Sequence, residues 1–236
     1  DGVYNYATGQ PIQMPELSPL TYGHTDARLI LRVGGSMGDV YGQRLLKRDL
    51  NGYILNEEGV GLAMENKETY LGSILPKMNM GWSLGFGYKG VNLGMTFTGR
   101  FGGIVISETQ SVLDAAGVSK VSADVRDAGG VQINQSKVSA QTYYQTIQGT
   151  AAYYTYSATN VRLGELSLSY TLPKKWFDNK VGMTVGLVGK NLWMIYCKAP
   201  FDPELTTSAA SNFYQGFDAY MLPSTRNFGF NVKFQF

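Results

Sequence analysis

Cysteine, histidine and charge are all scarce in this chain of 236 residues. Cys197 is the only cysteine and His24 the only histidine, so no disulfide can form within the chain and no Cys/His metal-ligand set is available. Charged residues make up 16% of the sequence and leave a net charge of +2, too little to indicate a nucleic-acid partner. The sequence also shows no Ser-His-Asp arrangement for nucleophilic catalysis. We therefore expect no metal, no cofactor and no enzymatic activity.

Long apolar runs are missing as well. A transmembrane helix needs roughly 18 or more consecutive apolar residues, and no such run occurs. Glycine, in contrast, is abundant: the chain has 29, well above the usual share of about 7%. The excess falls in segments that read as strands and turns, so we expect an all-β fold.

Alternation of apolar and polar side chains is the main pattern. In residues 224–236, Phe228, Phe230, Val232 and Phe234 share one face, because side chains of a strand alternate with period two. The dipeptide Lys89-Gly90 separates two such runs and predicts a tight hairpin. In all, the sequence predicts seven strands, at residues 28–33, 40–47, 79–88, 91–101, 161–172, 181–193 and 224–236.

The polar faces of these strands favour a transmembrane barrel. They carry mostly Gly, Ser, Thr and Asn, whereas Trp and Tyr lie toward strand ends on the apolar face. A lipid-facing apolar band with interfacial aromatics and a wet lumen requires this arrangement, and the longer runs have about the length of a tilted membrane-spanning strand. The alternative is a soluble antiparallel β-sandwich with long strands, which could bind carbohydrate.

Long and short connections alternate between the predicted strands. Residues 51–77, 102–160 and 208–222 are long, whereas residues 34–39, 89–90 and 173–180 are short. If the carboxyl terminus is periplasmic, every long connection is extracellular, as in outer-membrane barrels. Single-chain bacterial barrels close with an even number of strands. The odd count therefore predicts that the chain forms one end of a larger barrel.

Two patterns suggest chemistry but have simpler explanations. Asp202 and Glu204 resemble a glycosidase carboxylate pair, but two carboxylates within three residues are common by chance. The segment from Asp49 has acidic residues, yet Gly52 is fourth rather than sixth, so the register of a calcium-binding EF-hand loop fails. Asn51-Gly52 instead predicts a type I′ hairpin turn.

Candidate ligand-binding residues lie in the connection 102–160, where a short helical turn is also predicted near residues 113–117. Aromatic faces stack on sugars and pack on peptides, and an extracellular loop would meet the ligand first. The alternative is that these side chains pack within a folded loop or contact a partner. The candidates are Tyr143, Tyr144, Tyr153, Tyr154 and Tyr156. Arg100 shares its parity with Thr96 and Thr98 and is predicted to face the lumen.

Several segments, in order, resemble the C-terminal part of SusC/RagA-type TonB-dependent outer-membrane transporters. They are GGSMGDVYG (residues 34–42), YLGSILPKMNMGWSLGFGYKGVNLGMTFTGRFGG (70–103), SADVRDAGGV (122–131), ATNVRLGELSLSYTLPKKW (158–176), VGLVGKNLW with FDPE (185–204), and PSTRNFGFNVKFQF (223–236). The resemblance covers residues 33–236 and ends on Phe236, which it implies to be the barrel-assembly signal.

This resemblance implies a multi-pass barrel of about 22 strands in the outer membrane of a Gram-negative bacterium, with a plugged lumen. Residues 1–236 would be the C-terminal part of one barrel domain, and the plug and N-terminal strands would lie outside this sequence. The barrel would import glycans or peptides with a SusD-like surface lipoprotein, contact TonB through the missing N-terminal part, and permit a dimer of transporter–lipoprotein pairs. A passive or structural outer-membrane barrel, such as a porin or adhesin, remains the alternative beside the soluble sandwich.

Overall fold

The computed structural model describes residues 20–21, 25–32, 34–57, 61–177, 181–205 and 215–235. These residues form mostly antiparallel β-structure with three short α-helices. The chain divides into two compact units: the first comprises residues 1–75, 103–156 and 204–221, the second residues 76–102, 157–203 and 222–236. No helix in the described ranges combines the length and apolar character needed to cross a bilayer.

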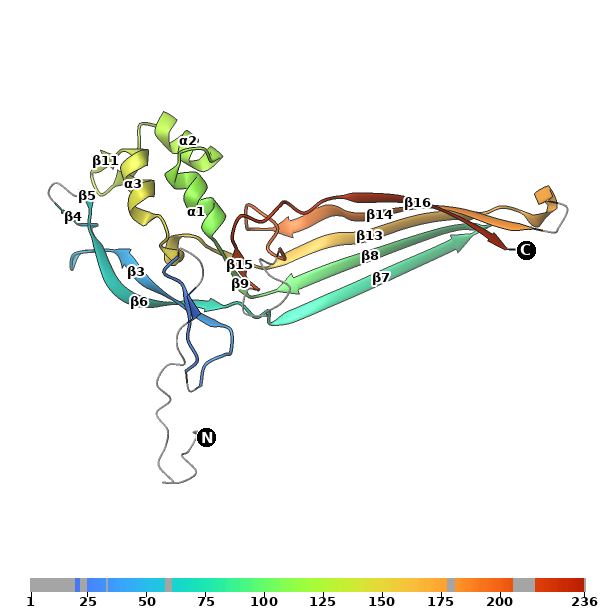
Figure 1. The fold of residues 1–236 in the computed structure, drawn as a ribbon, viewed down its shortest axis with the longest axis horizontal. Helices are drawn as coiled ribbons and strands as arrows, with labels where there is room; N and C mark the ends of the chain where they lie inside the picture. Colours follow the sequence, from blue (N-terminus) through green and yellow to red (C-terminus); the bar gives the residue numbers. More distant parts are fainter. Residues whose placement is uncertain are drawn as a thin grey trace, which may run out of the picture. The chain divides into compact units, whose positions relative to one another are not determined.

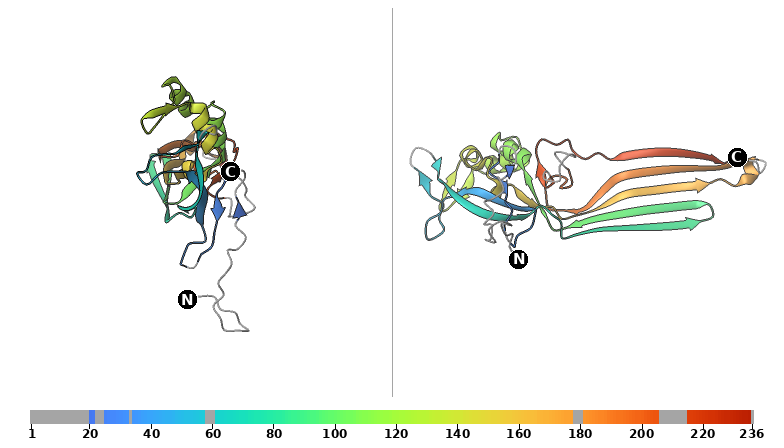
Figure 2. Two further views of the ribbon diagram at one scale, coloured as in Figure 1. Left: turned by 90° about the vertical axis from the view of Figure 1, so that its left-hand side faces the viewer. Right: turned by 60° about the horizontal axis from the view of Figure 1, so that its bottom comes forward.

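The second unit is one antiparallel sheet with the strand order β16-β14-β13-β8-β7 (Figures 1 and 2). Each strand carries the alternating pattern predicted from the sequence. Its elements are β7 (Met78–Tyr88), β8 (Val91–Phe101), β13 (Asn160–Thr171), η2 (a 3-10 helix, Lys174–Phe177), β14 (Gly182–Cys197) and β16 (Asn227–Gln235). The sheet is open, because β7 and β16 form its two edges among the described strands.

A two-residue turn joins β7 to β8, as predicted. Lys89 and Gly90 have φ values of 45° and 87°, and Tyr88 pairs with Val91. Positive φ at both central residues is the mark of a type I′ turn, whose twist matches that of the flanking strands. A Cβ on Gly90 would lie 2.8 Å from the Thr171 carbonyl oxygen, so glycine is required there for space as well as for conformation.

One irregularity changes the side-chain parity of β13. Leu163 pairs with Phe97 of β8 and Glu165 pairs with Thr96, so Gly164 is an extra residue opposite β8. Such a β-bulge puts Leu163 and Glu165 on opposite faces, although they are two residues apart. The register with β14 shifts at the same place, between Leu163 and Glu165.

The first unit combines small sheets with helices (Figure 1). Its sheets have the orders β1-β2-β3-β6, β12-β9-β15, β4-β5 and β10-β11. The strands are β1 (Leu20–Thr21), β2 (Arg28–Leu29), β3 (Asp39–Leu46), β4 (Asn56–Glu57), β5 (Gly61–Leu62), β6 (Met64–Ser73), β9 (Ile104–Ser107), β10 (Val131–Ile133), β11 (Ser136–Val138), β12 (Thr155–Ser157, whose last residue falls in the second unit) and β15 (Phe217–Asp218). The helices are α1 (Glu108–Ala115), α2 (Lys120–Asp127), α3 (Ala140–Ile147) and the 3-10 turn η1 (Ala151–Tyr153).

Serine caps begin all three α-helices. The hydroxyl oxygens of Ser107, Ser119 and Ser139 accept hydrogen bonds from backbone N–H groups in the first turns of α1, α2 and α3. Each cap satisfies a donor that the helix itself cannot pair. Two apolar clusters then hold the unit together, one around Val40, Ile74 and Ile106 and one that includes Tyr144 and Tyr154.

Five of the predicted strands correspond to β7, β8, β13, β14 and β16, and the strand predicted at residues 40–47 to β3. Two details are wrong. The strand predicted at residues 28–33 shortens to β2, and residues 51–77, predicted as a loop, contain the ten-residue strand β6. Long and short connections therefore do not alternate strictly, because β6 ends at Ser73 and β7 begins at Met78.

The turn predicted at Asn51-Gly52 is a hairpin turn of a different type. Gly52 has a φ of 85°, while Asn51 is not left-handed, so the turn is not type I′. Asp49 Oδ1 instead accepts from the N–H groups of Asn51 and Tyr53, at 2.8 Å each. The helical turn predicted near residues 113–117 is the end of a longer helix, α1.

Candidate functional site

Apolar side chains line up in rows across one face of the five-stranded sheet. The backbone register places partners on neighbouring strands directly beside one another, so the same face carries the large side chains of each strand. One row crosses all five strands and consists of Phe86, Leu93, Leu168, Leu187 and Phe230.

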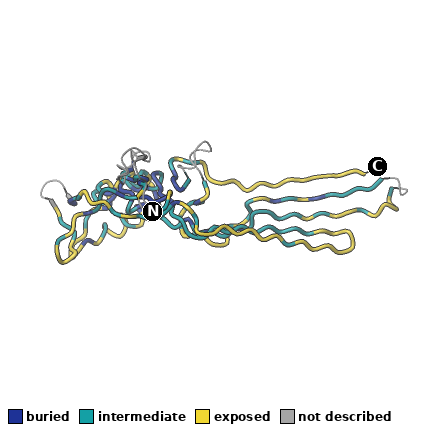
Figure 3. Tube along the Cα trace, turned by 90° about the horizontal axis from the view of Figure 1, so that it is seen from below, coloured by how far each residue is buried: buried dark blue, intermediate teal, exposed yellow. Residues whose placement is uncertain are grey.

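This apolar face is exposed. Trp82, Leu168 and Phe230, on three different strands, keep 62%, 46% and 69% of their surface accessible. In Figure 3 most residues of the two edge strands, β7 and β16, are coloured as exposed. A soluble sandwich would pack these side chains into a dry interior, since large contiguous apolar patches are rare on soluble monomers. In the described residues they do not converge on one.

The opposite face of the sheet is polar. Arg100 pairs with Asn79 on one side and with Asn160 on the other, and it shares this face with Thr96 and Thr98, as the parity of β8 predicted. Hydroxyl pairs link neighbouring strands here, for example Ser83 and Thr96, whose oxygens lie 3.1 Å apart.

A buried ion pair lies at one end of the polar face. Arg162 donates to both carboxylate oxygens of Asp202, at 2.9 and 2.7 Å, and also donates to Asn160 Oδ1. The two charged side chains are 10% and 7% exposed. A bidentate arginine–carboxylate pair is among the stronger and more directional polar contacts in proteins. Asp202 is thus held by Arg162, which supports the interpretation that the Asp202/Glu204 pair is not catalytic.

Side-chain parity in the sequence does not predict the ion pair of Arg162 and Asp202. Counting back from Leu168 and Leu166 places Arg162 on the apolar face, because all three have even numbers. The bulge at Gly164 reverses that assignment and brings Arg162 to the polar face opposite Thr98. The glycine within an otherwise regular strand was the only local signal.

The five candidate tyrosines come together in the first unit. All belong to or pack against the same apolar cluster, but Tyr144 and Tyr154 are buried, whereas Tyr143, Tyr153 and Tyr156 are half-buried. The rings of Tyr143 and Tyr144 meet edge to face at 5.2 Å, and Tyr153 Oη accepts a hydrogen bond from the Leu46 N–H. Packing within the folded connection therefore accounts for much of this tyrosine content.

Burial controls the ionisation of the Tyr154 and Tyr156 phenols. It raises the pKa of Tyr156 to about 12, and the negative charge of Asp114 adds to the effect. Burial likewise raises the pKa of Tyr154, again with Asp114 as the next contributor. Both phenols are neutral donors over the physiological range, suited to packing or hydrogen bonding rather than to acid–base chemistry.

Other predicted sites add little chemistry. Within the described ranges, no three His, Cys, Asp or Glu side chains cluster to hold a metal ion. Cys197 is partly buried and its Sγ lies 3.5 Å from the Ala199 carbonyl oxygen, a weak thiol hydrogen bond. His24 and the terminal Phe236 lie outside the described residues.

Comparison with known proteins gives similarity of fold only. No family model and no curated protein matches the sequence. Solved structures that share the fold include two chains of one transport system. One is a chain of the RagAB peptide importer in its closed-closed state, with 16% identity, a TM-score of 0.52, and 92% of this chain aligned to 28% of that one. The other is a chain of the RagAB peptide transporter, with 21% identity, a TM-score of 0.51, and 82% of this chain aligned to 22% of that one.

The chain thus spans about a quarter of the length of each neighbour. At these identities the alignment carries no residue-level roles from one protein to the other. The two neighbours are components of a transporter rather than enzymes, and theirs is the fold that this chain shares.

Proposed function

We propose that this chain forms part of the wall of an outer-membrane β-barrel importer of the SusC/RagA type. The observation that carries the proposal is the exposed apolar face of the five-stranded sheet, with Trp82, Leu168 and Phe230 accessible. Lipid hydrocarbon is the environment in which such a face is stable without a covering layer of protein. The strand lengths, nine residues in β16 to sixteen in β14, suit tilted strands that cross a bilayer.

The polar face lines the lumen in this proposal. Arg100 points toward it, and so does the pair of Glu165 and Lys190, whose charged atoms lie 3.7 Å apart across β13 and β14. Charged side chains are tolerated on the lumen side of a barrel strand and are costly on the lipid side. The open edges of the sheet, β7 and β16, would pair with further strands of a larger barrel of about 22 strands, within one barrel domain.

The remaining assignments follow the family resemblance and the fold of the neighbours. The protein would reside in the outer membrane of a Gram-negative bacterium and import a peptide or glycan with a SusD-like lipoprotein. Energy would come through TonB by way of sequence outside this chain, and transporter–lipoprotein pairs would dimerise. Phe236 would act as the assembly signal. Tyr143, Tyr153 and Tyr156 would offer their exposed edges to the ligand or to the lipoprotein, supported by the buried Tyr144 and Tyr154.

A spin-label experiment tests the orientation of the sheet. With Cys197 replaced by alanine, single cysteines at positions 187 and 230 would sample the apolar face, and matched cysteines at 188 and 231 the polar face of the same strands. In the membrane-inserted protein we expect the first two labels to collide with dissolved oxygen and the other two with a water-soluble nickel complex. If positions 187 and 230 are shielded from both reagents, the wall proposal is wrong.

A second experiment separates an importer from a passive barrel. Uptake of a labelled peptide mixture by intact cells should stop when the gene for TonB is deleted and persist in the parent strain. Uptake that survives the deletion would favour a porin, even if the spin labels confirm that the sheet faces lipid.

A further inference from the structure

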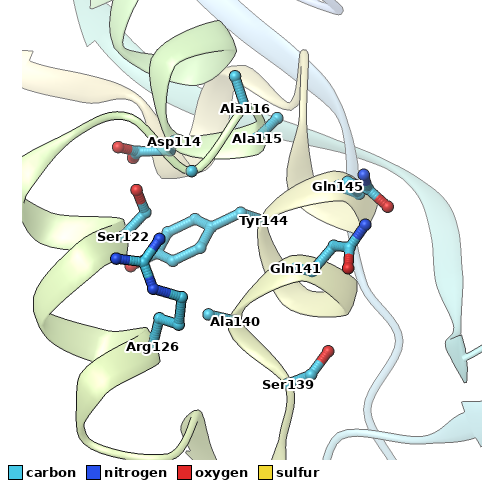
Figure 4. Close-up of a pocket in the computed structure, with 11 residues that line it drawn as sticks. Asp114, Ala115, Ala116, Ser122, Arg126, Ser139, Ala140, Gln141, Tyr144 and Gln145 are labelled. Carbon is cyan, nitrogen blue, oxygen red and sulfur yellow. The ribbon is translucent and has the colours of Figure 1, made fainter.

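A cavity of about 500 Å³ lies among the three helices of the first unit (Figure 4). Its wall is formed by the end of α1, by α2 and by the start of α3. The side chains that matter below are Asp114, Ser122, Arg126, Gln141, Tyr144 and Gln145. Only Tyr144 has a role in the function proposed above, as buried support for the neighbouring tyrosines.

Asp114 is the least compensated charge in this cavity. It is 5% exposed, and its side chain accepts one hydrogen bond, from Gln110 Nε2 to Oδ1 at 2.7 Å. None of the ion pairs between described residues includes Asp114. A carboxylate removed from water is costly unless a cation or several donors compensate it. Its charge also contributes to the raised pKa of the Tyr144 phenol, after burial. The cavity therefore has an anionic wall whose carboxylate forms no ion pair among the described residues.

Ser122 and Arg126 line the same cavity as this carboxylate. The Ser122 hydroxyl donates to the Ser119 carbonyl oxygen and accepts from Ser119 Oγ, both at 3.0 Å, which leaves one lone pair to accept a further donor. The Arg126 side chain is 62% exposed, with Nε 3.5 Å from Asp127 Oδ1. In Figure 4 the Asp114 carboxylate, the Ser122 hydroxyl and the Arg126 guanidinium gather on one side of the Tyr144 ring, with Gln141 and Gln145 on the other.

We propose that this cavity binds a free α-amino acid. In an α-amino acid the ammonium and the carboxylate are attached to one carbon, so the two charges need an acidic and a basic partner close together. Asp114 and Ser122 accept from the ammonium, and Arg126 donates to the carboxylate. The side chain of the ligand lies along Tyr144, with the two glutamine amides at its far end.

Other ligand classes fit this cavity less well. A neutral sugar would leave the Asp114 charge uncompensated. In a peptide the group next to the terminal ammonium is an amide, which does not present a carboxylate to Arg126. The proposal concerns a site within the first unit and does not depend on the transport function.

Calorimetric titration of the whole protein in detergent tests the proposal. Each of the twenty common L-amino acids would be titrated separately, followed by the N-acetyl and methyl-ester derivatives of the best binder. We expect at least one free amino acid to bind, and each blocked derivative to bind about tenfold more weakly or worse, because each loses a charge-assisted hydrogen bond.

Two variants locate the site. Asp114→Asn and Arg126→Gln should each weaken binding by about tenfold or more. The matched controls Asp124→Asn and Lys120→Gln change a carboxylate and a cation on α2 that are exposed and outside the cavity lining, and should leave the affinity unchanged. Arg126 is largely exposed, so its variant stays informative if Asp114→Asn fails to fold. The proposal is overturned if no amino acid gives heat at millimolar concentration, if the blocked derivatives bind equally well, or if the Arg126 variant retains full affinity.

Discussion

The two units of this chain are stabilised in different ways. The first has two apolar clusters, and nearly all the buried apolar residues described belong to it; in the second unit they are Ala158 and Pro203. The second unit keeps its large apolar side chains on an accessible face and relies on strand pairing within a single layer. One unit folds around its own interior, whereas the other leaves its apolar face uncovered among the described residues. The same hydrophobic effect operates in both, with protein as the cover in the first and, in our proposal, lipid in the second.

Breaking the buried ion pair of the second unit should have the largest effect. Arg162→Leu would remove the bidentate arginine from the buried Asp202 carboxylate, and breaking a buried ion pair from one side costs about 3–5 kcal/mol. Urea unfolding of the protein in lipid vesicles measures the loss. Lys190→Gln is the control, because the exposed pair with Glu165 contributes at most about 1 kcal/mol. Equal effects of the two variants would mean that Arg162 is not the anchor described here.

An arginine introduced on the apolar face of the sheet tests whether lipid covers that face. Phe230→Arg should destabilise the membrane-inserted protein by about 2–4 kcal/mol, the cost of arginine near the bilayer midplane. Asn231→Arg, the neighbouring residue on the polar face, should cost much less. The readout is again urea unfolding in vesicles. A small effect of Phe230→Arg together with a large effect of Asn231→Arg would reverse the assignment of the two faces.

A substitution in the turn between β7 and β8 should lower the stability by a smaller amount, and equally in lipid and in detergent. Gly90→Ala forces a Cβ into a left-handed conformation and against the Thr171 carbonyl oxygen, so we expect a loss of about 1–2 kcal/mol in lipid and in detergent alike. Gly85→Ala is the control, because a Cβ there meets no atom within 4 Å. A neutral Gly90→Ala would show that the turn relaxes to another type.

Alkaline titration examines the interior of the first unit. The folded pKa of Tyr156, about 12, lies above the usual tyrosine pKa of 10.0, so folding favours the protonated phenol. The corresponding stability is fully present below pH 10 and is lost as the pH rises through 12. Absorbance near 295 nm should show a late ionisation phase that Tyr156→Phe removes. If the phase stays in that variant, Tyr156 is not its source.

The sequence predicted the second unit well because its signals are local. The alternation in β7 and β8 and the dipeptide between them specify a hairpin without reference to the rest of the chain. The apolar and polar faces of the strands follow from parity, except on the far side of the bulge at Gly164.

The first unit was harder to predict because its structure depends on contacts distant in sequence. Strand β6 begins MENKE, with three charges and no apolar alternation, and is a strand because it pairs with β3. The cavity residues Asp114, Ser122 and Tyr144 come from three helices, and no spacing in the sequence relates them. The tyrosines were found from composition, but their burial depends on how α3 and its neighbours pack.

At Gly164, strand β13 can tolerate the deletion of one residue, which other positions in the strand cannot. Elsewhere in the strand, adding or deleting one residue would rotate every following side chain to the wrong side. Removing Gly164 instead would leave Val161, Leu163, Leu166 and Leu168 in unbroken alternation with Arg162, Glu165 and Ser167. Single-residue changes of length among relatives of this strand should therefore concentrate at this glycine, where the chain can lose a residue and keep both of its surfaces.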